Sequence, residues 1–188
     1  MKHRIKMLLV LTFFACVSGL VLSGIYMFAH PLIQQNLQQE LRRSIFQVVP
    51  GVEDYQKKQE GGVTYYVCRD ASGTTVGYAV PAEGNGYQGK IRVMIGLSPD
   101  LEKITGMRVL EQKETPGLGG RISEKSFQKQ FEGMAAQPRV GYVKNKRPEK
   151  PNNIQAITGA TISSRSVVAV VNKGVKNVEK VLKKTGGG

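Results

Sequence analysis

The hydroxyl residues near the C-terminus have the types and spacing that could do chemistry. Thr158, Gly159, Ala160 and Thr161 read as a tight turn of small residues, and a valine-rich helical pattern follows over residues 163–184. The N–H groups in the first turn of a helix lack partners inside the helix, and with the helix dipole they attract phosphate. A hydroxyl at this place can instead cap the helix, which is the commonest role of such residues. The residues alone leave both roles open.

A second candidate stretch, residues 111–121 (EQKETPGLGGR), has neither helical nor strand periodicity. It contains three glycines and one proline. Glycine permits positive φ and leaves the backbone accessible. Such a loop can bring its main chain against a planar or anionic ligand, or it can simply connect two elements.

The elements that must position these stretches belong to an α+β domain. Four segments show the alternation and flanking turns of strands, and their short connections predict an antiparallel sheet. A short helix is expected after Ser123 as its cap, with Phe127 and Phe131 on one face, before the long C-terminal helix. That last helix is rich in valine, so we expect packing against the sheet to stabilise it. Its expected buried positions are Ile162, Val167, Val170, Val171, Val175, Val178, Val181 and Leu182. The predicted strands are residues 63–68, 74–80, 90–97 and 104–110.

The N-terminus predicts a single membrane anchor. Residues 7–29 carry no charge and would span about 34 Å as a helix, enough for a hydrocarbon core of about 30 Å. This run is longer than the apolar region of a signal peptide and ends without a typical cleavage site. Basic residues in the segment 1–6 place that end in the cytoplasm and the main domain outside.

The remaining boundaries follow from composition. Residues 30–50 predict an amphipathic connecting helix that begins at Pro31 and ends at Pro50-Gly51. Residues 51–185 form the globular domain, and residues 186–188 are a disordered tail. The expected fold class is therefore α+β: one N-terminal transmembrane helix, then one extracytoplasmic domain with an antiparallel sheet and packed helices.

Composition excludes several function classes. The 188-residue chain has a formal net charge of +13, but its basic residues are dispersed and no RNP, zinc or helix-turn-helix signature occurs, so we expect no nucleic-acid partner. An anionic membrane surface or an acidic protein partner fits the charge equally well. Cys16 and Cys68 lack ligand neighbours at metal spacing. We find no catalytic triad, P-loop or carboxylate pair, and hence predict neither catalytic nor metal-binding residues.

Several motifs together resemble the FMN-binding domain family, specifically the G subunit of the Rnf electron-transport complex and the related C subunit of the sodium-pumping NADH:quinone reductase. The resemblance covers essentially the whole chain. Its carriers are the N-terminal span, residues 86–89 (GYQG), residues 114–119 (ETPGLG) and residues 158–164 (TGATISS). The motifs at residues 114–119 and 158–164 are specific as a pair, whereas either motif alone is weak evidence for the family.

The resemblance implies FMN joined covalently through its phosphate to the hydroxyl of Thr161, a bond made by a flavin transferase that uses FAD. The position three residues before the first hydroxyl of the motif holds Gln155, where the family pattern has Asp. The resemblance also implies further cofactor-binding residues, namely Thr158, Gly159, Ala160 and Ser163 around the turn and Glu114, Thr115, Gly117, Leu118 and Gly119 in the loop.

The implied function is that of a membrane-anchored electron-transfer subunit. It would work with other membrane and redox subunits of an Rnf-type complex that couples ferredoxin:NAD electron transfer to sodium or proton movement. It would have no substrate turnover of its own, and it would lie in a bacterial or archaeal plasma membrane. Two alternatives remain: a standalone extracytoplasmic flavoprotein carrier, and a non-redox anchor or assembly subunit.

Overall fold

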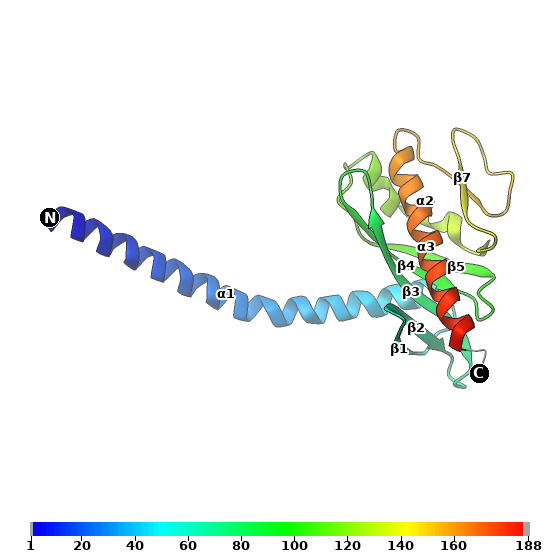
Figure 1. Ribbon diagram of the computed structural model, residues 1–188, viewed down its shortest axis with the longest axis horizontal. Helices are drawn as coiled ribbons and strands as arrows, with labels where there is room; N and C mark the ends of the chain where they lie inside the picture. Colours follow the sequence, from blue (N-terminus) through cyan, green and yellow to red (C-terminus); the bar gives the residue numbers. More distant parts are fainter. Residues whose placement is uncertain (1, 186–188) are drawn as a thin grey trace. The chain divides into compact units, whose positions relative to one another are not determined.

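The computed structural model describes residues 2–185, so the predicted disordered tail at 186–188 lies outside the described residues. The chain divides into two compact units, Met1–Arg42 and Arg43–Gly188. The first unit is helical, and the second contains the sheet and the remaining helices (Figure 1).

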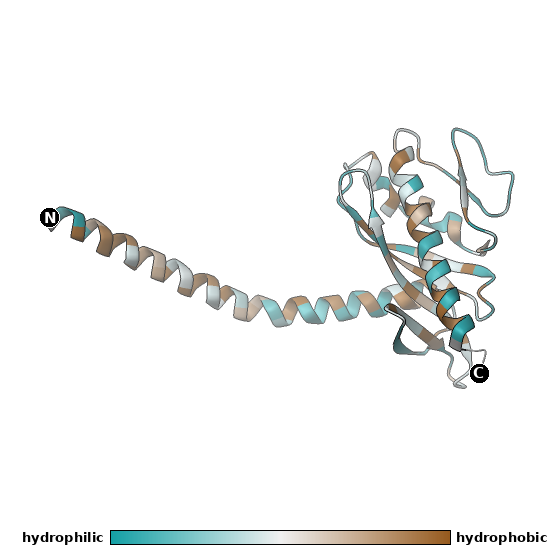
Figure 2. Cartoon of the chain, viewed as in Figure 1, coloured by the Kyte–Doolittle hydropathy of each residue, from teal (hydrophilic) through white to brown (hydrophobic). Residues whose placement is uncertain are grey.

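The N-terminal helix α1 runs without interruption over Lys2–Val48 and is long and apolar enough to cross a membrane. Figure 2 shows apolar residues predominating in its first half and polar residues interspersed in its second. The expected start of a separate helix at Pro31 is wrong, because Pro31 lies inside α1. A proline removes one backbone hydrogen bond, and the long helical runs on both sides keep theirs.

The second unit is built on a six-stranded sheet in which every neighbouring pair is antiparallel and the strand order follows the sequence. The four predicted strands and the α+β class are confirmed. The sheet also contains β1 and β6, which the pattern missed. β1 (DYQKKQE) is a mostly exposed edge strand and therefore lacks alternating apolar residues. The strands are β1 Asp54–Glu60, β2 Val63–Arg69, β3 Thr75–Asn85, β4 Lys90–Leu97, β5 Lys103–Glu111 and β6 Met134–Ala135.

Short helical segments connect the sheet to the C-terminal helix. They are the 3-10 helix η1 (Gly119–Ser123), α2 (Lys125–Gln128) and the 3-10 helix η2 (Lys129–Phe131), followed by a parallel pair of β7 (Gly141–Val143) and β8 (Asn153–Gln155), and then α3 (Thr161–Thr185). Phe127 and Phe131 are buried, with ring centroids 5.8 Å apart, as their spacing predicts. Ser123 is not the helix cap, because it closes η1 and Glu124 precedes α2.

The main core lies between the sheet and α3. Figure 1 shows α3 crossing β3 and β4, and its buried valines pack against apolar residues of the strands. Most of the predicted inward positions of α3 are confirmed, including Val167, Val171 and Val178. Ile162 was expected in this core but is 46% exposed. It lies in the first turn of α3, where the helix faces a surface cleft.

The opposite face of the sheet receives the last turn of α1. Gly77, Gly96 and Gly106 lie on three adjacent strands. Because they have no side chains, Val48 and Val49 pack directly against the backbone of the sheet there. The Thr105 hydroxyl donates a hydrogen bond to the Val48 carbonyl, which satisfies one of the free carbonyls at the helix end. Close backbone approach therefore fixes residues 43–48 to the sheet.

We expect Gly96→Ala to destabilise the second unit. The added Cβ would overlap the Val48 carbonyl oxygen and the Thr105 hydroxyl and would lie 2.6 Å from the Val48 carbonyl carbon. Overpacking of this kind costs roughly 1–3 kcal/mol. Urea unfolding of the detergent-solubilised chain measures the loss. Gly24→Ala is the control, because nothing lies within 4 Å of its added methyl. Equal stability of the two variants would contradict the close packing of Val48 against Gly96.

Candidate functional site

The three sequence motifs meet at one cleft of about 460 Å³, a volume within the usual range for small-molecule sites. It lies at the start of α3. Of the predicted site residues, all but Thr158 and Gly117 line it. Its lining residues are Tyr87, Glu114, Thr115, Leu118, Gly119, Gly159, Ala160, Thr161, Ile162 and Ser163.

The turn before α3 is fixed by its own hydrogen bonds. The Ala160 N–H donates to the Ile157 carbonyl at 2.9 Å, and Gly159 has φ of +81°, a conformation that favours glycine. The Ser164 hydroxyl accepts from the Ile157 N–H and donates to the Ala160 carbonyl, both at 3.0 Å. The helix therefore begins at a defined residue, Thr161.

The hydroxyls of this region fall into different environments. Ser163 and Ser164 are buried and hydrogen-bonded within the protein. Thr158 is exposed at the turn and lies outside the cleft. Thr161 is half-buried and lines the cleft, and within residues 2–185 its hydroxyl makes no hydrogen bond. Among the hydroxyls of this turn and of the first turn of α3, Thr161 is therefore the one best placed to react.

The start of α3 lacks a side-chain cap within the described chain. The residue before it is Ala160, whose methyl group accepts no hydrogen bond, and the Ser164 hydroxyl receives the Ile157 N–H and not one from the helix. The first-turn N–H groups are left without intrahelical partners. This geometry favours the phosphate interpretation of the turn over the simple cap.

Glu114 connects its own motif to the other two. Its carboxylate accepts the backbone N–H groups of Tyr87 at 2.8 Å and Gln88 at 3.0 Å, and also the Ser163 hydroxyl. Burial raises the pKa of this carboxyl, but the hydrogen bonds from Ser163, Gln88 and Tyr87 outweigh burial and hold the pKa below its ordinary value. Glu114 is therefore ionised at neutral pH.

The rim of the cleft is apolar and exposed. Tyr87, Leu118 and Ile162 are 67%, 49% and 46% exposed. Leu118 also touches the turn, because a Cβ on Gly159 would lie 3.5 Å from its side chain. Exposed apolar groups gathered around one cleft indicate a surface that binds a ligand or partner. Such a rim suits a flat aromatic group.

Sequence reasoning missed two lining residues, Tyr87 and Ile162. Tyr87 lies in the GYQG motif, so its place in a motif was an available signal. Ile162 follows the helical pattern of the core residues, and nothing in that pattern shows that the first turn extends past the sheet.

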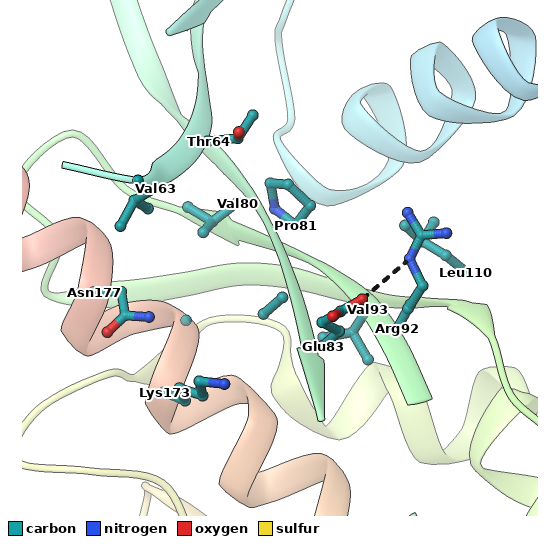
Figure 3. Close-up of a pocket in the computed structure, with 13 residues that line it drawn as sticks. Val63, Thr64, Val80, Pro81, Glu83, Arg92, Val93, Leu110, Lys173 and Asn177 are labelled. Atoms are coloured by element: carbon teal, nitrogen blue, oxygen red, sulfur yellow. Dashed lines mark ion pairs between the residues drawn. The ribbon is translucent and has the colours of Figure 1, made fainter. Parts of the chain in front are cut away.

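Two other clefts hold none of the predicted site residues. One of about 360 Å³ opens where β2 separates from β3 beyond Tyr66, next to Lys173 and Asn177 of α3 (Figure 3). Two of its charged lining residues, Arg92 and Glu83, form an ion pair with 4.0 Å between the Arg92 Nε and the Glu83 Oε2. Among the described residues, no group of three or more His, Cys, Asp or Glu side chains could hold a metal ion.

The part of the chain that forms the cleft matches a known protein family. The FMN-binding domain family matches residues 86–176, which include all three motifs. The chain is 35% identical to the G subunit of the proton-translocating ferredoxin:NAD(+) oxidoreductase complex of Clostridium ljungdahlii, over 94% of this chain and 91% of that protein. It is 29% identical to the G subunit of the ion-translocating oxidoreductase complex of Methanosarcina acetivorans, over 94% and 95% of the two chains.

The fold has solved counterparts. The crystal structure of the C subunit of the Na(+)-translocating NADH-quinone reductase from Parabacteroides distasonis matches with a TM-score of 0.65 and 20% identity, covering 80% of this chain and 95% of that one. The Shewanella oneidensis NqrC structure matches with a TM-score of 0.59 and 20% identity, covering 71% of each chain. At this level of identity, the likeness establishes the fold.

Proposed function

This chain belongs to the FMN-binding domain family, among the G subunits of ion-translocating oxidoreductase complexes, and we propose that it carries FMN joined covalently to Thr161. Its family makes it a flavin-carrying electron-transfer subunit of a membrane complex. When bound, FMN supplies the redox chemistry, and the protein supplies attachment, orientation and electrostatics.

The observation that carries the proposal is the position of the Thr161 hydroxyl. Thr161 is the first residue of α3 and lines the cleft together with residues of the 114–119 loop. Its hydroxyl makes no hydrogen bond within the described chain. In the proposed attachment, a flavin transferase supplies FAD. The Thr161 oxygen bonds to the phosphorus of the FMN half, the bond to the AMP half breaks, AMP leaves, and the hydroxyl proton passes to the transferase.

The protein offers compensation for the phosphate charge. The free first-turn N–H groups of α3 and the helix dipole stabilise an anion at this end. Arg165 lies one turn after Thr161 on the same helix face, at the i,i+4 spacing that brings side chains close. Arg165 is exposed, lines a different cleft with Tyr142 and Asn153, and makes no ion pair within the described chain.

The apolar rim offers contacts for the flavin ring system. We propose that Tyr87, Leu118 and Ile162 contact it and exclude water from part of its surface. Gly119 lines the cleft without a side chain, so the loop backbone can approach the ribityl chain there, whereas Gly117 lies outside the cleft lining. Gln155, in place of the family's usual Asp, has its backbone fixed in β8 by Gln130, so its main-chain position does not depend on a charge.

The proposed setting in the membrane follows the charge distribution. Residues 7–29 cross the membrane once, residues 1–6 lie in the cytoplasm, and residues 51–185 form the extracytoplasmic domain. The coupled reaction is ferredoxin:NAD electron transfer with sodium or proton movement, and other membrane and redox subunits exchange electrons with this one. Covalent attachment keeps the cofactor from diffusing away outside the cell membrane.

A denaturing gel tests the proposal directly. The chain is produced together with an active flavin transferase, denatured fully and viewed under ultraviolet light. We expect a fluorescent band at the mass of the chain, because only a covalent bond survives denaturation. The same chain produced without the transferase is the control and should be dark. A dark band in both preparations would overturn covalent attachment.

A further inference from the structure

The cleft contains a buried charge that the attachment step does not use. Glu114 is 6% exposed and is the only charged residue among the buried polar side chains of the described chain. No cation pairs with it in the part of the chain that the structure describes. A buried carboxylate without a counter-ion needs hydrogen-bond donors, and all those that Glu114 receives come from parts of the cleft.

These donors come from two segments distant in sequence from Glu114. One oxygen accepts the N–H groups of Tyr87 and Gln88, 27 and 26 residues earlier in the chain. The other oxygen accepts the Ser163 hydroxyl, 49 residues later. One carboxylate thus joins the 86–89 loop, the 114–119 loop and the first turn of α3, which are the three segments that line the cleft.

The glycines of the motifs make room for this carboxylate. A Cβ on Gly119 would lie 2.6 Å from a Glu114 oxygen and 2.6 Å from the Ser163 hydroxyl. A Cβ on Gly86 would overlap the other Glu114 oxygen. Both contacts are too close for any side chain. The lack of a side chain at Gly86 and Gly119 is therefore explained by the space that the Glu114 carboxylate occupies, and not only by the approach of a ligand.

We infer that Glu114 is the positioning residue of the cleft, whose ionised carboxylate holds the three lining segments in register and places a fixed negative charge beside the cofactor. The charge has a consequence for redox chemistry. Electrons added to a flavin in the cleft add negative charge, and a nearby carboxylate opposes this. The carboxylate therefore lowers the reduction potential of the bound flavin, and only this consequence rests on the proposed function.

Amide exchange on the flavin-free, full-length chain tests the positioning role alone. In Glu114→Gln the amide cannot match the charged acceptor, so we expect the N–H groups of Tyr87 and Gln88 to exchange roughly tenfold faster or more. Hydrogen–deuterium exchange of a peptide covering residues 86–90 measures this. Glu102→Gln, an exposed carboxylate at the β4–β5 turn, is the control and should exchange as the unsubstituted chain does.

A second variant covers the case in which Glu114→Gln does not fold. Ser163→Ala keeps the carboxylate but removes one of its donors, so exchange at Tyr87 and Gln88 should rise severalfold. Unchanged exchange in the folded Glu114→Gln chain, or in Ser163→Ala where Glu114→Gln is unfolded, overturns the positioning role.

The reduction potential separates an electrostatic role from a merely structural one. On the flavin-loaded chain we expect Glu114→Gln to raise the midpoint potential and Glu102→Gln to leave it unchanged. A potential that stays the same or falls in Glu114→Gln overturns the electrostatic part. If the unsubstituted chain carries no flavin, covalent attachment fails, and amide exchange still decides whether Glu114 positions the cleft.

Discussion

Thr161→Ala should leave the chain without covalent flavin, even when the flavin transferase is active. Alanine offers no oxygen to bond to phosphorus. The neighbouring hydroxyls cannot replace Thr161, because Ser163 and Ser164 are buried and hydrogen-bonded and Thr158 lies outside the cleft. We therefore expect complete loss, read as absence of fluorescence on a denaturing gel and as the intact mass of the unmodified chain.

Two further variants sharpen this result. Thr158→Ala changes the neighbouring hydroxyl at the exposed turn and should retain full flavin content. Thr161→Ser keeps an oxygen at the same position and should retain attachment, at a lower rate because its side chain is less restrained. Flavin on Thr161→Ala, or a dark Thr158→Ala beside a fluorescent Thr161→Ala, would move the site away from Thr161.

Gly119→Ala should disrupt the cleft without touching Thr161. Its Cβ would meet a Glu114 oxygen and the Ser163 hydroxyl at 2.6 Å and the Glu114 Cβ at 2.9 Å. Relief of these contacts separates the 114–119 loop from α3. We expect the free energy of unfolding to fall by roughly 1–3 kcal/mol, and flavin content to fall well below that of the unsubstituted chain. Urea unfolding and gel fluorescence measure the two effects.

The adjacent glycine provides the matched control. A Cβ on Gly120 would meet its nearest atom, the Thr115 carbonyl oxygen, at 3.2 Å, which a shift of a few tenths of an ångström relieves. Gly120→Ala should therefore keep more stability and more flavin than Gly119→Ala. If the two variants behave alike, the clash with Glu114 and Ser163 is not what constrains the loop.

The local patterns of the sequence determined most of the elements. Strands β2 to β5 are short segments rich in apolar residues and bounded by turn residues, and the valines of α3 recur at helical spacing, so these patterns identified them. The motifs at residues 114–119 and 158–164 pointed to a flavin family, and the family comparison agrees. The exposed strand β1 was not predicted, because it has no apolar period. The uninterrupted passage of α1 through Pro31 was not predicted, because proline is typical of the first turn of a helix.

The tertiary structure alone decided how the residues of the site divide their work. Glu114 was expected to line the cofactor, and the structure places it in the cleft lining with its carboxylate bound by donors 27 residues before it and 49 residues after it. Such contacts depend on the packing of three loops, which no local pattern encodes. The same packing buries Ser163 and leaves Thr161 facing the cleft. The residues of the turn alone left several hydroxyls open, and the family resemblance favoured Thr161. Burial and hydrogen bonding in the folded chain give the physical difference between Thr161 and the neighbouring hydroxyls.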